Sequence, residues 1–152
     1  MELDTDDINV KQLSVADTAL TQQLFTLLQQ VFEMDTVGIL TETYLKTLLT
    51  NPSFIVFAAF QKNEIVGGLT AYVLPMYCTE HAEVYIYDIA VAPQFQRKGI
   101  GKRLLAAIKE YSRQNGIRGV FVQADEADEH ALDFYRAAGG SEERVRHFTF
   151  RP

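Results

Sequence analysis

Residues 83–105 read EVYIYDIAVAPQFQRKGIGKRLL, and this stretch decides the fold. Its first nine residues are dense in β-branched and aromatic side chains, which favours a buried strand over 83–91. Pro93 and two glycines then break the pattern. The apolar residues that follow recur at helical spacing before Gly116, a natural helix stop, and are Leu104, Leu105, Ile108 and Tyr111. The stretch therefore predicts a strand, a glycine-containing turn and an amphipathic helix in succession.

The turn between that strand and helix, residues 96–103 (QRKGIGKR), has the composition of an anion-binding site. Backbone N–H groups at a helix N-terminus can be directed at an anion, and Gly99 and Gly101 allow a close approach. The helix dipole and four basic side chains add positive potential. We interpret the turn as a pyrophosphate cradle, although it is neither a Walker loop nor a Rossmann fingerprint. A solvated basic helix start, with glycines serving only the turn, fits the residues equally well.

The segment before residue 52 predicts one strand and two helices. Ile8 and Val10 alternate with polar residues, which indicates a short strand. Ser14 begins a capping-box-like pattern followed by apolar residues at helical spacing. Thr41 is expected to cap a second, short helix that ends before Pro52.

Two β-rich runs, 54–60 and 65–74, are separated by a short polar turn and predict a hairpin. Gly67-Gly68 inside the second run indicates a bulge or a close backbone approach. Together with the strand over 83–91, the hairpin predicts a mixed sheet that is antiparallel first and then continues through βαβ-like crossovers.

After the helix that ends at Gly116, the pattern returns to strands. A strand is predicted over 119–124, then a helix capped by Asp128 and ended by Gly139-Gly140. Residues 145–150 alternate in a way that predicts a last strand.

Composition and charge exclude several classes of protein. The chain has 152 residues and no Gly/Ser/Pro-rich linker, so we expect a single domain over 1–152. Its net charge of −6 disfavours nucleic acid and fits a cationic partner. No apolar stretch approaches the roughly 20 residues of a membrane span, and the acidic start is unlike a secretory signal. The single Cys78 favours a reducing compartment, so we expect a cytoplasmic protein.

Two motifs carry a resemblance to a known family. QRKGIG, which follows the strand YIYDIAV and precedes an amphipathic helix, resembles the acetyl-CoA motif Q/R-x-x-G-x-G/A of the GNAT acetyltransferases. DEHALDFYRAAGG, residues 128–140, resembles the N-x-x-A-x-x-x-Y helix of that family, with Asp128 in place of the usual asparagine. The resemblance implies the GNAT fold, an α/β (α+β) fold with a mixed, mostly antiparallel sheet of about six to seven strands and about four helices. From about Asn51 onward, the chain is similar to the aminoglycoside 3-N-acetyltransferase branch.

The resemblance also implies acetyl-CoA as cosubstrate. The three histidines, His81, His130 and His147, are scattered along the chain, so we expect no metal site. The backbone of the strand before the turn would pair with pantetheine, while a plain core strand is the alternative for the same residues. The residues expected to contact the cosubstrate are Ile89, Ala90, Val91, Gln96, Arg97, Lys98, Gly99, Ile100, Gly101, Lys102, Asp128 and Ala131. By motif position Tyr135 becomes the general acid for the leaving thiolate, although its spacing alone predicts an aromatic that packs a helix onto the sheet.

Acetyl transfer to an amine also needs a group that takes the amine's proton. The candidates are three carboxylates, and we favour Asp125, at the carboxyl end of a strand, over Glu83, at the start of one. Asp88 is two residues from Ala90 and opposite in parity to Tyr85 and Tyr87. In the resembling family an acid at this place is frequent across unrelated acceptors, which implies a structural role. No covalent nucleophile is required if the amine attacks directly in a ternary complex, and Cys78 is interpreted as a plain loop thiol.

An acidic run follows the strand over 119–124 and predicts that the acceptor is a cation. A negative rim attracts polycations, although a merely solubilising surface is the alternative. Asp125, Glu126 and Tyr85 are the predicted acceptor-binding residues. We expect a polycationic small molecule and, by resemblance, the 3-amino group of an aminoglycoside. Two alternatives stay open. One is a GNAT enzyme acting on another amine, such as a polyamine, an amino acid derivative or a peptide N-terminus, and the other is a non-catalytic CoA-binding module. The resemblance also implies a homodimer.

Overall fold

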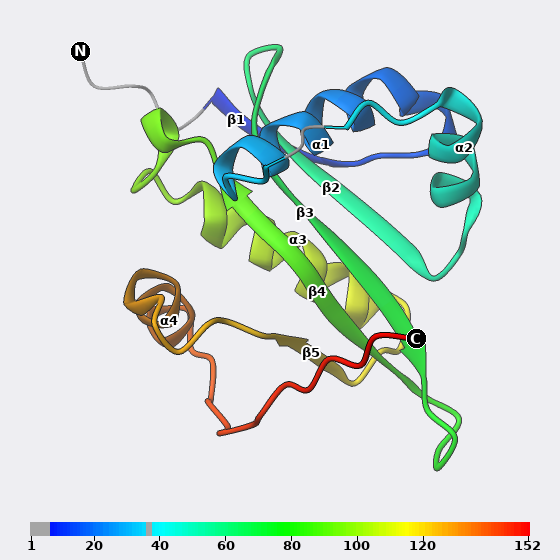
Figure 1. Cartoon of the computed structure of the whole chain (residues 1–152), viewed down its shortest axis with the longest axis vertical. Coiled ribbons are helices and arrows are strands. Elements are labelled where there is room, and N and C mark those ends of the chain that lie inside the picture. Colours follow the sequence, from blue (N-terminus) through cyan, green and yellow to red (C-terminus); the bar gives the residue numbers. More distant parts are fainter. Residues whose placement is uncertain (1–6, 36–37) are drawn as a thin grey trace. The chain divides into compact units, whose positions relative to one another are not determined.

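The computed structural model describes residues 7–35 and 38–152, which fall into two compact units that meet in sequence between Val122 and Gln123. The first unit holds a five-stranded sheet with strands in the order β1-β2-β3-β4-β5 (Figure 1). Their bounds are Ile8–Gln12 for β1, Phe54–Gln61 for β2, Glu64–Pro75 for β3, Ala82–Val91 for β4 and Gly119–Val122 for β5. Each of the first four strands is antiparallel to its neighbour, whereas β4 and β5 are parallel and are joined through helix α3 (Ile100–Gln114). The mixed sheet predicted from the sequence is confirmed.

Helices cover both faces of this sheet and divide the core into two clusters (Figure 1). On one face, α3 packs against the strands through a cluster that includes Leu69, Ile86, Ile100, Leu104 and Ile108. On the opposite face, called here the α1/α2 face, lie α1 (Thr18–Val31) and α2 (Glu42–Thr50), whose cluster includes Leu24, Leu28, Leu45, Val56 and Ala90. Alternating side chains of one strand therefore enter different clusters, as the pleat requires.

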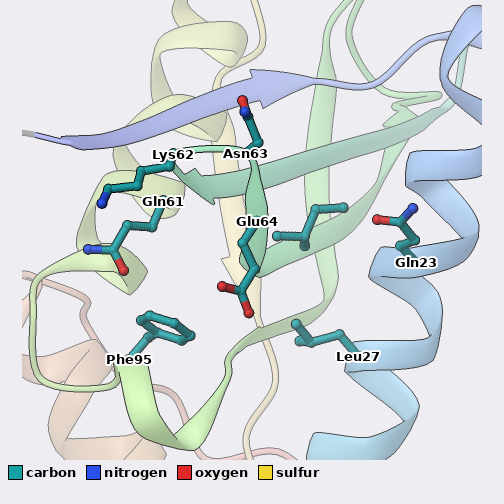
Figure 2. Close-up of a pocket in the computed structure, with 8 residues that line it drawn as sticks. Gln23, Leu27, Gln61, Lys62, Asn63, Glu64 and Phe95 are labelled. Carbon is teal, nitrogen blue, oxygen red and sulfur yellow. The ribbon is translucent and has the colours of Figure 1, made fainter.

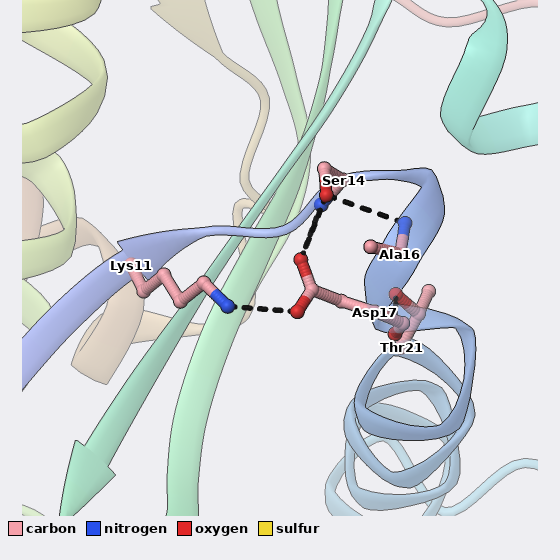
Figure 3. Close-up of polar contacts among 5 residues, drawn as sticks. All are labelled: Lys11, Ser14, Ala16, Asp17 and Thr21. Carbon is pink, nitrogen blue, oxygen red and sulfur yellow. Dashed lines mark hydrogen bonds and ion pairs between the residues drawn. The ribbon is translucent and has the colours of Figure 1, made fainter.

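The entry into α1 is fixed by the carboxylate of Asp17 (Figure 3). Ser14 donates its backbone N–H to Asp17 Oδ2 at 2.8 Å, and Ala16 donates its N–H to Ser14 Oγ at 3.3 Å, which is the predicted capping box, here around a short 3₁₀ helix (Val15–Asp17). Lys11 of β1 donates to Asp17 Oδ1 at 2.7 Å. The hydrogen bond from Lys11, then that from Ser14, lowers the pKa of Asp17 below its ordinary value. One side chain thus joins β1 to the start of α1.

Gly67 and Gly68 stand where neighbouring elements come very close, as predicted. A Cβ on Gly67 would lie 2.7 Å from the carbonyl oxygen of Ala90 on β4. A Cβ on Gly68 would lie 2.6 Å from the carbonyl oxygen of Phe57 and would collide with Leu24 of α1. The pairing of β2 and β3 also shifts beside Gly67, between Ala59 and Phe60. Both alternatives offered for the glycine pair, a bulge and a close approach, are therefore present.

The second unit contains one helix, α4 (Glu129–Ala137). Asp128 caps it by accepting the N–H of Ala131 at 3.0 Å, and Gly140 closes its end by donating to the carbonyl of Tyr135 at 2.9 Å. The predicted strand over 145–150 is wrong, because residues 140–152 form neither helix nor strand. Its apolar side chains, Val145, Phe148 and Phe150, are largely exposed. Alternation expresses a preference, but a strand exists only where a second strand pairs with it.

The α/β class is confirmed, with four α-helices and five strands among the described residues instead of six to seven strands. The strand predicted over 119–124 ends at Val122. Within the described part of the chain, no helix has the length and apolar character needed to cross a membrane. The single domain over 1–152 stays a prediction.

Candidate active site

Strand β4 carries a bulge at Tyr87. Its partner β3 places Ala71 opposite Ile86 and Thr70 opposite Asp88, so two consecutive residues of β3 face three of β4. Tyr87 is the extra residue, and its side chain is 60% exposed. A bulge of this kind reverses the alternation of the strand beyond it.

The reversal brings Asp88 onto the α1/α2 face. Before the bulge, Ile86 packs into the α3 cluster; after it, Ile89 packs there, and Ala90 packs with the α1/α2 residues. Tyr85 and Asp88 therefore share the α1/α2 face, although the sequence parity separates them. The opposite parity of Asp88 and Tyr85 expected from the sequence is wrong at this point, because it assumed an unbroken pleat. The structural role expected of Asp88 stays a prediction. An acid inside an otherwise apolar strand, EVYIYDIAV, was the signal in the sequence.

Beyond the bulge, β4 also loses its second neighbour. Strand β5 pairs with β4 only from Glu83, opposite Gly119, to Ile86, opposite Val122. Among the described strands, none pairs with that edge of β4 over Ile89–Val91. An unpaired strand edge presents backbone donors and acceptors that an extended ligand can pair with. The predicted contact of Ile89, Ala90 and Val91 with a pantetheine arm therefore has an edge available to it.

The turn after β4 leads into the N-terminus of α3. Gly99 precedes the helix in the left-handed region at φ 77°, and Arg97 is left-handed at φ 61°. Gly99, the N-cap residue of α3, makes no side-chain capping hydrogen bond to the first backbone N–H groups of the helix. Gln96 donates its side-chain amide to the carbonyl of Val91 at 3.0 Å and braces the turn against the end of β4. The uncapped helix start has the donors and dipole that an anion requires.

The four basic side chains of the turn have different tasks. Arg103 donates to the carbonyl of Ile8 on β1 at 2.9 Å, and Lys98 donates to the carbonyl of Gln94 at 3.3 Å. The structure records no ion pair for Arg97 or Lys102 within residues 7–35 and 38–152, and both are exposed. Arg97 and Lys102 are therefore the cations that suit a pyrophosphate best. Ile100 is 1% exposed, so any contact it makes with a ligand would come from its backbone.

A row of aromatic rings crosses the sheet on the α1/α2 face. Tyr72 of β3 meets the ring of Tyr87 at 5.8 Å, Tyr87 meets Tyr85 at 5.8 Å, and Tyr85 stacks on Phe121 of β5 at 4.9 Å. The row begins in the core at Phe54, 5.2 Å from Tyr72, and becomes exposed toward β5. Aromatic faces of this kind bind ammonium groups and the apolar faces of sugars.

Electrostatics distinguish Asp88 on this face. Burial raises the pKa of Asp88 above its ordinary value. Burial, followed by the neighbouring Tyr87 and Asp88, also raises the pKa values of Tyr72 and Tyr85. Glu83 lies on the same face but farther along β4, where β5 still pairs with the strand, and a Cβ on Gly119 would meet its carboxylate at 3.3 Å.

Within the second unit, the predicted site residues have local structural contacts. Asp125 accepts the N–H of Ala127 at 2.9 Å, so it makes the turn contact that was the alternative to a catalytic role. Glu126 is exposed, and Tyr135 packs edge-on against Phe134 at 5.2 Å. The catalytic and acceptor-binding roles assigned to Asp125, Glu126 and Tyr135 stay predictions.

One open hollow of about 790 Å³ lies elsewhere, at the turn between β2 and β3 (Figure 2). Glu64 and Phe95 point into it, and its other lining residues are Gln23, Leu27, Gln61, Lys62, Asn63 and Ile65. None of these residues belongs to the predicted site. Across the described ranges, no three His, Cys, Asp or Glu side chains are grouped so that they could hold a metal ion.

Comparison with known proteins gives a consistent result. Residues 21–139 match the model of the acetyltransferase (GNAT) family. An aminoglycoside acetyltransferase from an uncultured soil metagenomic sample, meta-AAC0020, solved in complex with sisomicin, is 41% identical over 97% of each chain, with a TM-score of 0.94. A second soil metagenomic aminoglycoside acetyltransferase, HMB0005, is 37% identical over 95% of this chain and 98% of its own, with a TM-score of 0.91. An uncharacterized N-acetyltransferase of Bacillus subtilis, YhfO, is 29% identical over 90% of this chain and 91% of its own.

Proposed function

Because this chain belongs to the GNAT family of acetyltransferases and is an acetyl-CoA-dependent N-acetyltransferase, we propose that it acetylates an aminoglycoside, at the amino group of the 3-position. The transfer is direct, from cosubstrate to amine in a ternary complex. The observation that carries this proposal is the parting of β5 from β4 after Ile86, beside the uncapped N-terminus of α3. An acyl donor with an extended arm and a pyrophosphate needs both features together.

The residues of the first unit suggest how acetyl-CoA would be held. The backbone of Ile89–Val91 pairs with the pantetheine arm, and the N–H groups of Gly99 to Gly101 receive the pyrophosphate. Arg97 and Lys102 add charge at the same place. Acetyl-CoA supplies the thioester whose acetyl group is transferred.

The chemical class of the acceptor is inferred from the charge and the aromatic side chains of the α1/α2 face and from the similar proteins. The aromatic row and the carboxylates of the α1/α2 face suit a molecule that combines sugar rings with ammonium groups. The 41% identical structure in complex with sisomicin supports an aminoglycoside in particular. Asp125, Glu126 and Tyr85 are proposed to contact its amino groups, with Asp125 or Glu83 as the base. Tyr135 is proposed to return a proton to the departing thiolate.

The test is CoA release from acetyl-CoA, followed with a thiol reagent across gentamicin-type aminoglycosides, polyamines and short peptides. We expect turnover with aminoglycosides, and a product whose 3-amino group carries the acetyl group by NMR. Turnover with polyamines or peptides alone would refute the acceptor, and acetylation at another amine would refute the regiochemistry. Tyr135→Phe is expected to lower kcat while leaving the Kd of acetyl-CoA unchanged. A proposed homodimer is checked by light scattering.

A further inference from the structure

The open hollow at the turn between β2 and β3 takes no part in the proposed acetyl transfer. Its volume of about 790 Å³ lies within the range of small-molecule sites, about 300–1,000 Å³. Figure 2 shows Glu64 in the middle of the hollow, with Phe95 on one side and Leu27 of α1 on the other. All of its lining residues belong to the first unit, so the hollow is formed within one compact body. It is therefore a second place at which a small ligand can bind.

A strained turn carries Lys62 at the rim of this hollow. Lys62 and Asn63 are the two residues between Gln61 and Glu64, which pair with each other at the end of the β2–β3 ladder. Lys62 has a φ of 55°, in the left-handed region. When the first residue of a two-residue hairpin turn has a positive φ, that residue is normally glycine, because a Cβ makes this conformation unfavourable. A side chain that is kept in a strained position indicates a function for that side chain.

The hollow carries one cation and one anion that do not neutralise each other. Lys62 and Glu64 are both exposed, and two positions of the chain span at most about 7 Å. Among the described residues, no ion pair joins them or links either to a third side chain. A ligand of small size that has an ammonium group for Glu64 and a carboxylate for Lys62 would form charge-assisted hydrogen bonds with both.

Three side chains that line the hollow are apolar. Ile65 is buried, and Leu27 and Phe95 are half-buried, so each leaves part of its surface for a ligand. The ammonium group of Lys98 lies 5.3 Å from the centre of the Phe95 ring, so the chain itself already provides this ring with a cation. Glu64 is therefore the group that is left for the ammonium group of a ligand, and the apolar surface suits a hydrocarbon side chain.

We propose that the hollow binds a free α-amino acid with an apolar side chain. Glu64 receives the ammonium group of the amino acid, and Lys62 receives its carboxylate. The apolar side chain packs against Leu27, Ile65 and Phe95. An aminoglycoside does not fit this description, because it has ammonium groups but no carboxylate for Lys62. The hollow also contains none of the residues proposed to contact acetyl-CoA or the acceptor, so the amino acid binds beside both substrates without replacing either.

Isothermal titration calorimetry with L-leucine and L-phenylalanine tests the proposal. We expect both to bind the wild-type protein with a Kd in the millimolar range or below. L-leucinamide lacks the carboxylate and 4-methylpentanoate lacks the ammonium group, so each should bind at least about tenfold more weakly than L-leucine. Glycine, which lacks the apolar side chain, should also bind at least about tenfold more weakly.

Variants separate binding from a structural role of the turn. Glu64→Gln and Lys62→Gly should each raise the Kd of L-leucine by about tenfold or more. Glycine adopts a positive φ without strain, so the thermal midpoint of Lys62→Gly should equal or exceed that of wild type. Glu33→Gly is the matched control, because Glu33 is an exposed charged residue with a φ of 50° outside the hollow. It should bind L-leucine as wild type does.

Several results would overturn the proposal. One is a wild-type protein that binds neither L-leucine nor L-phenylalanine, and another is a Kd of L-leucine that is unchanged in both Glu64→Gln and Lys62→Gly. Equal binding of glycine and L-leucine would contradict the apolar contact. Loss of L-leucine binding at saturating acetyl-CoA or sisomicin would show that the amino acid occupies a substrate site instead. If wild type acetylates no aminoglycoside, the proposed function fails, while the binding measurements still test the hollow.

Discussion

Replacing Gly67 with alanine tests the closeness of β3 to the proposed cosubstrate strand. The added Cβ would lie 2.7 Å from the carbonyl oxygen of Ala90, 3.2 Å from Cα of Val91 and 3.3 Å from its Cγ2. Ordinary contact begins at 3.4 Å, so β3 and β4 must separate by about 0.7 Å at this point, and backbone atoms have no rotamer to which they can retreat.

The expected cost follows from this geometry. Overpacking of about one methyl group costs about 1–3 kcal/mol, and the lost backbone freedom of the unfolded chain returns about 0.4–1 kcal/mol. We therefore expect the free energy of unfolding to fall by about 1–2 kcal/mol. In a chain of this size, that lowers the thermal midpoint by about 2–8 °C. The separation displaces Ala90 and Val91, so the KM for acetyl-CoA should rise as well.

Circular dichroism during thermal and urea unfolding measures the first effect, and steady-state kinetics measure the second. Gly38→Ala is the matched control, because a Cβ there meets nothing within 4 Å. It should leave the thermal midpoint unchanged or raise it slightly. If Gly67→Ala and Gly38→Ala unfold at the same temperature, the close approach of β3 and β4 is not a constraint and the reasoning is wrong.

Two further changes test the helix starts. Asp17→Ala removes the capping contacts and the partner of Lys11, so we expect a loss of about 1 kcal/mol at neutral pH. The pKa of Asp17 is lowered below 3.8 in the folded protein, so the ionised carboxylate stabilises the fold above pH 3.8. This stabilisation disappears as the pH falls through the pKa of Asp17 in the folded protein. The urea unfolding curves of wild type and Asp17→Ala should therefore converge at low pH. Gly99→Ala places a Cβ at φ 77° with open space around it, so the strain alone should cost about 1–2 kcal/mol. If the turn relaxes into another conformation instead, the KM for acetyl-CoA should rise while the free energy of unfolding stays the same. A Gly99→Ala variant with unchanged KM and unchanged free energy of unfolding would contradict an ordered left-handed turn.

Local sequence signals predicted most of the elements. Ser14, Thr41 and Asp128 cap helices as expected, and Gly116 follows the end of α3. These signals work because a cap satisfies backbone groups within the same turn of helix. The glycine turn before α3 was predicted for the same reason, since strand, glycines and helix are adjacent in sequence.

The tasks of individual polar side chains were less predictable. Four bases around the turn read as one positive cluster, yet Arg103 reaches the carbonyl of Ile8, a residue 95 positions away. Asp125, a candidate base, also accepts the N–H of Ala127 in its own turn, and its catalytic role stays a prediction. A long polar side chain can hydrogen-bond to any of several partners, and the partners that lie within its reach are set only by the completed fold.

The sequence by itself determined the family, the strand-turn-helix unit around Gly99 and the apolar faces of the helices, because each depends on residues close together in the chain. The tertiary structure decided the face on which Asp88 stands, the point at which β5 leaves β4 and the absence of a strand over 145–150. These features depend on the register between strands. A bulge of one residue changes the face of every side chain beyond it, and it can be seen only when the partner strand is in place.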